Sequence, residues 1–487
     1  MSQQRPFLGR IRGNFAGRVL TLAMATALQI VLGVALLPLA TRVLSAPDFG
    51  AYGLLMSVVA LVAAISDGGA GLILPSKFEP ASAEERRRLV ASLAWLSLAV
   101  STTAGMLLLA LWPWHHVVFP SGSLDVIPLA AVLLAAAVMP ARAVTSVAVS
   151  VFSVTGRGVA IAAQMVAQSV TLFLTTLIAL FVFALGTASL FVGVFCGQLA
   201  ALSVALWLLG GGYVFALPAR RWLALTATSA PTAGVAGLVD GLRVVGENAL
   251  LARVSGLGAV GYLSHARLYA GMLISASNAV AHNVWARSLR EARETAGEFD
   301  FTGRAWAPVH LGLTIIGLVF VFVGTEIVHV ITNGKLDPAA DFIPGFVVIA
   351  LVQSSGKPNT AAIYAIGSVI ALSWIRVALV VVGLVALLPA IALLGIWGIL
   401  AVTLAEALAY RICIRLLTLK YRKVPFQDQF VVLGIMVIAA GFALVQFVPL
   451  SLGARMAIMI AGVAALLAAG RHVMADAIAA IRAVLGS

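Results

Sequence analysis

The chain has 487 residues, of which 62% are hydrophobic and only 10% charged, and its mean hydropathy is +1.08. Soluble domains are about half apolar and about a quarter charged, so this composition excludes a soluble protein and predicts an integral membrane protein. The apolar runs are too long for the tilted strands of a membrane β-barrel, which have about ten residues. The formal net charge of +13 indicates orientation in a membrane rather than nucleic-acid binding, since Lys and Arg collect on the cytoplasmic side.

Apolar runs long enough to cross a bilayer follow one another along the whole chain. They predict an all-α polytopic membrane protein of about fourteen transmembrane helices, and no soluble domain fits between them. The predicted spans are residues 20–44, 50–74, 89–111, 126–150, 159–184, 188–210, 229–253, 258–285, 306–331, 340–364, 368–388, 391–415, 429–448 and 452–470.

Basic residues are unevenly divided between alternate connections. One set of connections carries most of the 31 Lys and Arg residues, whereas the opposite set carries only Arg42, Arg253, Lys335 and Arg455. The positive-inside rule therefore predicts that both termini are cytoplasmic. On this view residues 1–19 form a basic cytoplasmic N-terminus, and residues 471–487 form an amphipathic tail on the inner surface.

A short pattern occurs twice in the chain. "RVLSAPDFGAYG" begins at Arg42 and "RVSGLGAVGYLS" begins at Arg253, and each places a glycine eight positions after its arginine, at Gly50 and Gly261. Chance matching of so short a pattern is the alternative, but both copies fall between equivalent spans, six helices apart. We therefore predict a parallel repeat with the substrate path between its halves. The predicted parts are a first six-helix lobe (20–210), a cytoplasmic linker (211–228), a second six-helix lobe (229–415) and two extra C-terminal helices (416–470).

Two longer segments around this pattern carry a family resemblance. "LLPLATRVLSAPDFGAYGLLMSVVALVAAISDGGAG" (Leu36–Gly71) resembles the opening of polysaccharide-biosynthesis flippases of the multidrug/oligosaccharidyl-lipid/polysaccharide (MOP) exporter superfamily. "LGAVGYLSHARLYAGMLISASNAVAHNVWARSLREARE" (Leu257–Glu294) is similar to the segment that opens their second lobe. The resemblance implies a V-shaped pair of helix bundles that works by alternating access.

The resemblance also implies a function. It is that of a flippase moving polyprenyl-diphosphate-linked oligosaccharide from the cytoplasmic to the periplasmic face of a bacterial inner membrane. The products served would be the O-antigen of lipopolysaccharide, capsule or exopolysaccharide. Such a protein is not an enzyme and needs no cofactor. Its partners would be the lipid-linked oligosaccharide, membrane lipid and polysaccharide polymerase or assembly proteins, with no nucleic acid. The two cysteines give no metal-ligand spacing.

Three other functions remain open. Multidrug or metabolite antiporters of the same superfamily commonly use an acidic residue in the first helix, and span 20–44 contains no Asp or Glu. Peptidoglycan-precursor flippases usually open with a different, Arg-rich sequence, which this chain does not show. A membrane polysaccharide polymerase or ligase usually has a large periplasmic loop, whereas the longest outer connection here, around "WPWHHVVFPSGSLD", is short.

Charged residues inside apolar spans are costly, so they are the candidates for substrate binding. A lipid diphosphate needs cations in its path, and arginine binds phosphate with two parallel hydrogen bonds. In span 229–253 the i, i+3, i+7 spacing places Asp240, Arg243 and Glu247 on one helical face. A closed ion pair is the alternative role for Arg243. The substrate-binding candidates are Arg243, Arg267, Arg142, Asp240, Glu247, Asn248 and Lys357.

Lys357 lies in "SSGKPN", which lacks the glycine spacing and the preceding strand of a phosphate loop. The segment predicts a helix break at membrane depth, which is tolerated only where it lines protein or water. Because no ATPase domain is present, the energy would come from an ion gradient, the membrane potential or consumption of the product. The ion-coupling candidates are Asp67, Glu326 and Glu406, and capping of a helix is the alternative role for Asp67.

Overall fold

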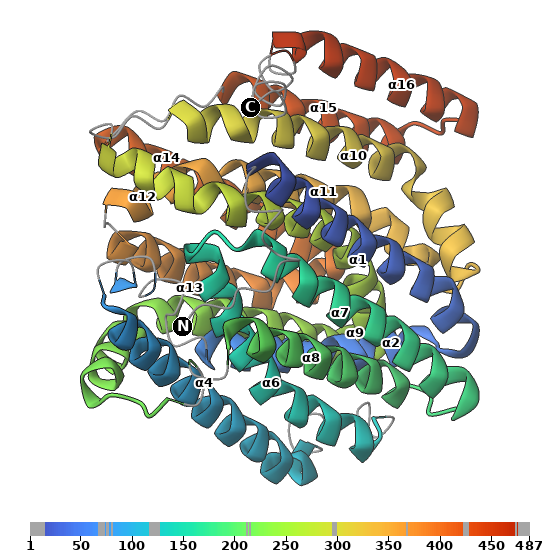
Figure 1. Ribbon diagram of the computed structural model, residues 1–487. Helices are drawn as coiled ribbons and strands as arrows, with labels where there is room; N and C mark the ends of the chain where they lie inside the picture. Colours follow the sequence, from blue (N-terminus) through green and yellow to red (C-terminus); the bar gives the residue numbers. More distant parts are fainter. Residues whose placement is uncertain are drawn as a thin grey trace.

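The computed structural model describes residues 15–66, 81–115, 127–210, 216–294, 300–366, 369–421 and 428–472, together with residues 74, 77, 78, 213 and 475. Throughout these ranges the regular elements are helices, and they run roughly side by side across the molecule (Figure 1). The predicted all-α class is confirmed.

The helices match the predicted apolar runs closely. They are α1 (Phe15–Val43), α2 (Ala46–Ser66), α4 (Ala83–Leu111), η2 (Trp112–Trp114), α6 (Leu129–Val154), α7 (Gly158–Leu177), η3 (Ile178–Val182), α8 (Ala188–Leu209), α9 (Arg220–Glu294), α10 (Asp300–Thr332), η4 (Asp337–Phe342), α11 (Ile343–Ser355), α12 (Lys357–Ile366), α13 (Val369–Leu394), α14 (Ile396–Tyr421), α15 (Asp428–Phe447) and α16 (Leu452–Ala469). Within the described ranges, ten helical stretches are long and apolar enough to cross a membrane. The number fourteen, the cytoplasmic termini and the division into lobes stay predictions.

Gly256 marks where a long helical run changes direction. At Gly256 the backbone has φ +82° and ψ 169°, a conformation that glycine adopts without steric cost because it has no Cβ. This kink divides α9 into α9a (residues 220–255) and α9b (residues 257–294), so the two predicted spans meet with almost no loop between them. The break predicted in "SSGKPN" is only a one-residue interruption at Gly356 between α11 and α12, because the backbone there stays helical (φ −79°, ψ −18°) and residues 337–360 form one continuous helical stretch.

The repeated glycines face one another across the contact between α2 and α9b. A Cβ on Gly50 would lie 1.9 Å from the carbonyl oxygen of Leu257, and a Cβ on Gly261 would lie 2.1 Å from the carbonyl oxygen of Ala46. The sequence offset that relates Gly50 to Gly261 also relates Ala46 to Leu257. The contact is therefore reciprocal, as a local two-fold axis requires, and the two copies of the pattern form one interface.

Small residues continue this close contact along α2. A Cβ on Gly53 would lie 2.1 Å from Ser264 Oγ in α9b. Farther along α2, Gly237 and Gly241 of α9a approach Ala64 and Leu61, with the nearest atoms 3.2 and 2.6 Å from their would-be Cβ atoms. Glycines let the helix backbones approach closely, which is the main source of helix association in lipid. As a result, α2 is held against both halves of α9.

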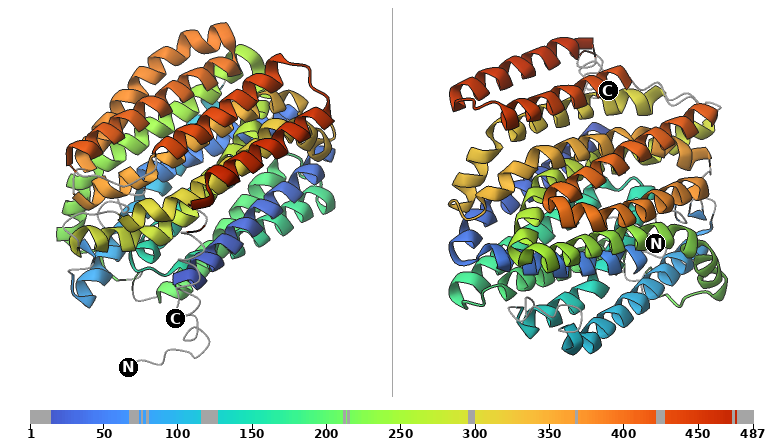
Figure 2. Two further views of the ribbon diagram at one scale, coloured as in Figure 1. Left: turned by 90° about the horizontal axis from the view of Figure 1, so that it is seen from above. Right: turned by 180° about the vertical axis from the view of Figure 1, so that it is seen from behind.

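The two C-terminal helices lie at one edge of the molecule, on the side opposite α4 (Figures 1 and 2). An ion pair ties α16 to α10, because Arg455 Nη2 donates to Glu326 Oε1 and Nη1 donates to Oε2 at 3.4 Å. The same Nη1 reaches the carbonyl oxygen of Phe322 at 3.4 Å. Glu326 therefore has a partner that fixes the position of an outer helix.

Replacing Gly50 with alanine tests the reciprocal contact. The added methyl would meet the Leu257 carbonyl oxygen, which is rigid backbone, so α2 and α9b must move apart. We expect a loss of about 1–3 kcal/mol in stability, as for overpacked cores, and a lower apparent melting temperature of the detergent-solubilised protein in size-exclusion chromatography. The matched control is Gly258→Ala, since no atom lies within 4 Å of a Cβ there. Equal melting temperatures for the two variants would contradict the contact.

Candidate functional site

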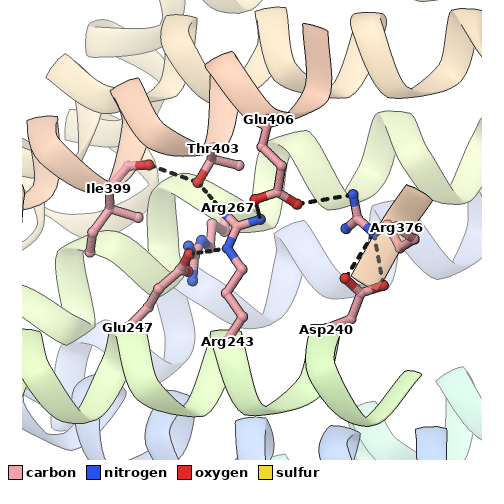
Figure 3. Close-up of polar contacts among 8 residues, drawn as sticks. All are labelled: Asp240, Arg243, Glu247, Arg267, Arg376, Ile399, Thr403 and Glu406. Carbon is pink, nitrogen blue, oxygen red and sulfur yellow. Dashed lines mark hydrogen bonds and ion pairs between the residues drawn. The ribbon is translucent and has the colours of Figure 1, made fainter. Parts of the chain in front are cut away.

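Six charged side chains from α9, α13 and α14 form one continuous ion-pair ladder (Figure 3). Positive and negative groups alternate along it, and its three arginines balance its three carboxylates. In order, the members are Arg267, Glu247, Arg243, Glu406, Arg376 and Asp240. We refer to these six residues as the charge ladder.

Arg243 is the centre of the charge ladder. Its Nε donates to Glu247 Oε1 at 2.7 Å, one helical turn further along α9a, and its Nη1 donates to Glu406 Oε2 in α14. Its Nη2 donates to Thr403 Oγ1 at 2.6 Å. Arg243 is only 6% exposed, so its charge depends on these partners for compensation. The sequence allowed either substrate binding or a closed ion pair for Arg243, and the structure contains the ion pair.

The two ends of the charge ladder are more accessible than its middle. Arg267 Nη2 donates to the second oxygen of Glu247, and its guanidinium lies 5.4 Å from the ring centre of Phe346. At the other end, Arg376 Nε donates to both Asp240 oxygens at 2.8 and 3.1 Å, and Nη1 lies 3.1 Å from Glu406 Oε1. The exposed fractions of the terminal side chains are 25% for Arg267 and 39% for Asp240.

Arg142 of α6 has a different environment. It is half-buried and lies within electrostatic range of Tyr52 in α2. Among the residues that the structure describes, no carboxylate forms an ion pair with Arg142. It is therefore an arginine inside the helix bundle whose charge these residues leave uncompensated.

The other predicted candidates are dispersed. Asn248 Nδ2 points at the carbonyl oxygen of Gly53 at 3.5 Å, within the contact between α2 and α9. Lys357 Nζ donates to Asn278 Oδ1, at the break between α11 and α12. Two of the ion-coupling candidates are engaged, Glu326 by Arg455 and Glu406 by the charge ladder. Asp67 lies outside the described residues.

A cavity of about 450 Å³ lies between α1, α2, α7, α8 and α9b. None of the nine predicted candidates that the structure describes is among its lining residues, although Ser264, His265 and Leu268 on either side of Arg267 are. Its polar lining consists of uncharged or weakly basic groups: Gln29, Tyr52, Gln168, Ser169, Thr176, Ser264, His265 and Ser275. Arg142 is not among the lining residues, but Tyr52, which lies in the cavity wall, is within electrostatic range of it.

These cavity residues were not predicted from the sequence, because they lack the charge that marks a costly residue inside an apolar span. The signal that could have found them is the recurrence of glutamine inside apolar runs, at Gln29, Gln164, Gln168 and Gln198. Arg376 and Thr403 were also not predicted as site residues, since their role depends on packing between helices that the sequence does not specify.

A family model described as "Polysaccharide biosynthesis protein" matches residues 16–286, more than half of the chain. The chain belongs to the polysaccharide biosynthesis protein family. A sequence comparison with curated proteins found no significant match to this chain.

Solved structures show the fold of this polysaccharide biosynthesis protein. It is similar to the lipid II flippase MurJ in an inward closed conformation, with a TM-score of 0.67, 11% identity, and coverage of 93% of this chain and 100% of that one. It is also similar to an outward-facing multidrug resistance MATE family transporter of the MOP superfamily and to a MOP superfamily transporter from Pyrococcus furiosus. Both have a TM-score of 0.58 and 15% identity, and each match covers 90% of this chain and 99% of the other. The chain therefore has the fold of a multi-pass MOP superfamily protein.

Replacing Arg243 with alanine tests the charge ladder. The variant would leave a ladder with one excess negative charge in a buried site, and breaking such a buried pair costs about 3–5 kcal/mol. We expect poor yield or a strongly lowered melting temperature in detergent. The control is Arg253→Ala, at an exposed position on the same helix run.

The double variant Arg243→Ala/Glu406→Ala restores neutrality and should recover part of the lost stability, which a double-mutant cycle measures. Wild-type stability of Arg243→Ala, or strictly additive losses in the double variant, would contradict the assignment.

Proposed function

We propose that this protein is a flippase for polyprenyl-diphosphate-linked oligosaccharide. It moves this lipid from the cytoplasmic to the periplasmic face of a bacterial inner membrane by alternating access, for synthesis of O-antigen, capsule or exopolysaccharide. Family membership supports a role in polysaccharide synthesis. The observation that carries the substrate class is Arg142, a half-buried cation within electrostatic range of Tyr52, for which no described carboxylate compensates.

An uncompensated cation inside a helix bundle is expensive in a membrane protein, so it calls for an anion that is present during part of the working cycle. A lipid diphosphate supplies such an anion. Arginine suits it because the planar guanidinium can donate two parallel hydrogen bonds to phosphate oxygens. We therefore assign the first diphosphate contact to Arg142.

Arg267 is the second contact in this proposal, from the other half of the molecule. It uses one nitrogen on Glu247, keeps a quarter of its side chain exposed, and lies between residues that line the cavity. Arg243 and Glu247 hold it in place rather than touching the substrate, because their charged groups are almost completely buried. Asp240 holds Arg376 in the same way.

The remaining candidates have smaller roles in the proposal. Asn248 stabilises the contact between α2 and α9, and Lys357 with Asn278 forms a separate polar point at the break between α11 and α12. If Glu326 or Glu406 binds a coupling ion, it must first release an arginine. Asp67, which lies outside the described residues, stays a coupling candidate from the sequence alone.

A multidrug or metabolite antiporter is the second candidate, because the fold is shared with multidrug resistance MATE transporters. The sequence of span 20–44 argues against a cation antiporter, since it offers no carboxylate. No feature of the described residues supports polymerase partners or the less favoured function of a polymerase or ligase.

Replacing Arg142 tests the proposed function. One or two charge-assisted hydrogen bonds of about 1.5–3 kcal/mol each correspond to a loss of roughly tenfold or more in transport. We expect this loss for Arg142→Ala in proteoliposomes, measured as appearance of polyprenyl-diphosphate-linked glucose in the opposite leaflet.

Arg142→Lys, which keeps the charge but not the planar fork, should lose less. Arg253→Ala is the control. Wild-type transport by Arg142→Ala at equal protein content would contradict the assignment.

A further inference from the structure

We propose that the cavity between α1, α2, α7, α8 and α9b binds the sugar next to the diphosphate and selects an uncharged sugar. This inference rests on the proposed function and deepens it, because it names the class of sugar that the protein accepts. It is independent of which polymer the sugar later enters.

The first argument is that the described cavity lining carries no permanently charged side chain. No Asp, Glu, Lys or Arg is among the described residues that line the cavity. A carboxylate brought into a weakly polar cavity loses its hydration and gains no counter-charge in return. Neither Arg142 nor Arg267 is among the lining residues, and in the proposed function both charges are used by the diphosphate. An acidic sugar would therefore enter without a counter-charge.

The hydrogen-bonding groups are the second argument. Amides and hydroxyls offer both donors and acceptors, as sugar hydroxyl groups do. Gln168 Nε2 donates to Gln198 Oε1 at 3.1 Å, which fixes the amide of Gln168 and leaves its oxygen as an acceptor. Thr176 also lines the cavity, but its Oγ1 is buried against Gly193, where a Cβ would lie 1.8 Å from it.

Size and shape are the third argument. About 450 Å³ falls in the usual range of small-molecule sites, which is about 300–1,000 Å³. Apolar and aromatic side chains, including Phe49, Tyr52 and Phe173, form much of the wall. They can cover the apolar faces of a sugar ring, while Gln29, Gln168 and His265 contact its edge. His265 is itself oriented, since its Nε2 lies 3.1 Å from the Tyr269 hydroxyl.

Two lipid-linked probes test this selectivity. Polyprenyl-diphosphate-linked glucose and polyprenyl-diphosphate-linked glucuronate differ only in a carboxylate, and the full-length protein in liposomes would be given each in turn. We expect glucose to cross at least about tenfold faster, which corresponds to about 1.4 kcal/mol. Equal rates would overturn the inference and leave the proposed flippase standing. Transport of neither probe would overturn both.

Charge variants of the cavity make the test specific. Gln168→Lys supplies a counter-charge, so the ratio of glucose to glucuronate transport should fall about tenfold toward one. Gln29→Lys does the same from α1, at an exposed position where the fold should tolerate it. Gln353→Lys, an exposed glutamine outside the cavity, is the matched control and should leave the ratio unchanged. An unchanged ratio in both cavity variants, or rates that depend on polyprenyl length instead of sugar charge, would overturn the inference.

Discussion

Charge inside a bilayer must be compensated, and this constraint explains most of the polar architecture of the molecule. The charge ladder meets it by alternating three arginines with three carboxylates, so that α9, α13 and α14 are joined without a net charge. Arg455 and Glu326 meet it in the same way between α10 and α16. Arg142 stands apart, because the described residues provide no carboxylate for it. Its compensation is the role that we give to the substrate.

The second constraint is close approach of helix backbones. Lipid provides no hydrophobic drive for helix association, so glycine contacts and polar pairs must supply it. The reciprocal contact of Gly50 and Gly261 explains why the chain repeats one short pattern, since each copy is the docking surface of the other. This contact and the cavity are built from the same helices, α2 and α9b. Relative movement of the two halves would therefore change the shape of the cavity directly, as alternating access requires.

Features with a strong local signal could be predicted from the sequence. Span-length apolar runs predicted the helices. The helical period correctly placed Asp240, Arg243 and Glu247 on one face. The same spacing could not show that Glu406, Thr403 and Arg376 complete the ladder, because those residues come from α13 and α14 and meet α9 only after packing. Neither could it identify the cavity, whose neutral side chains resemble ordinary polar residues of membrane helices.

The most direct measurement of the central claim is the membrane face that holds lipid-linked sugars in cells depleted of this protein. Polyprenyl-linked oligosaccharide would be labelled in intact cells and in inverted vesicles, and surface polymer would be quantified in parallel. The account predicts that the lipid-linked oligosaccharide accumulates on the cytoplasmic face and that surface polymer is lost. Normal transfer to the periplasmic face with unchanged polymer would contradict it.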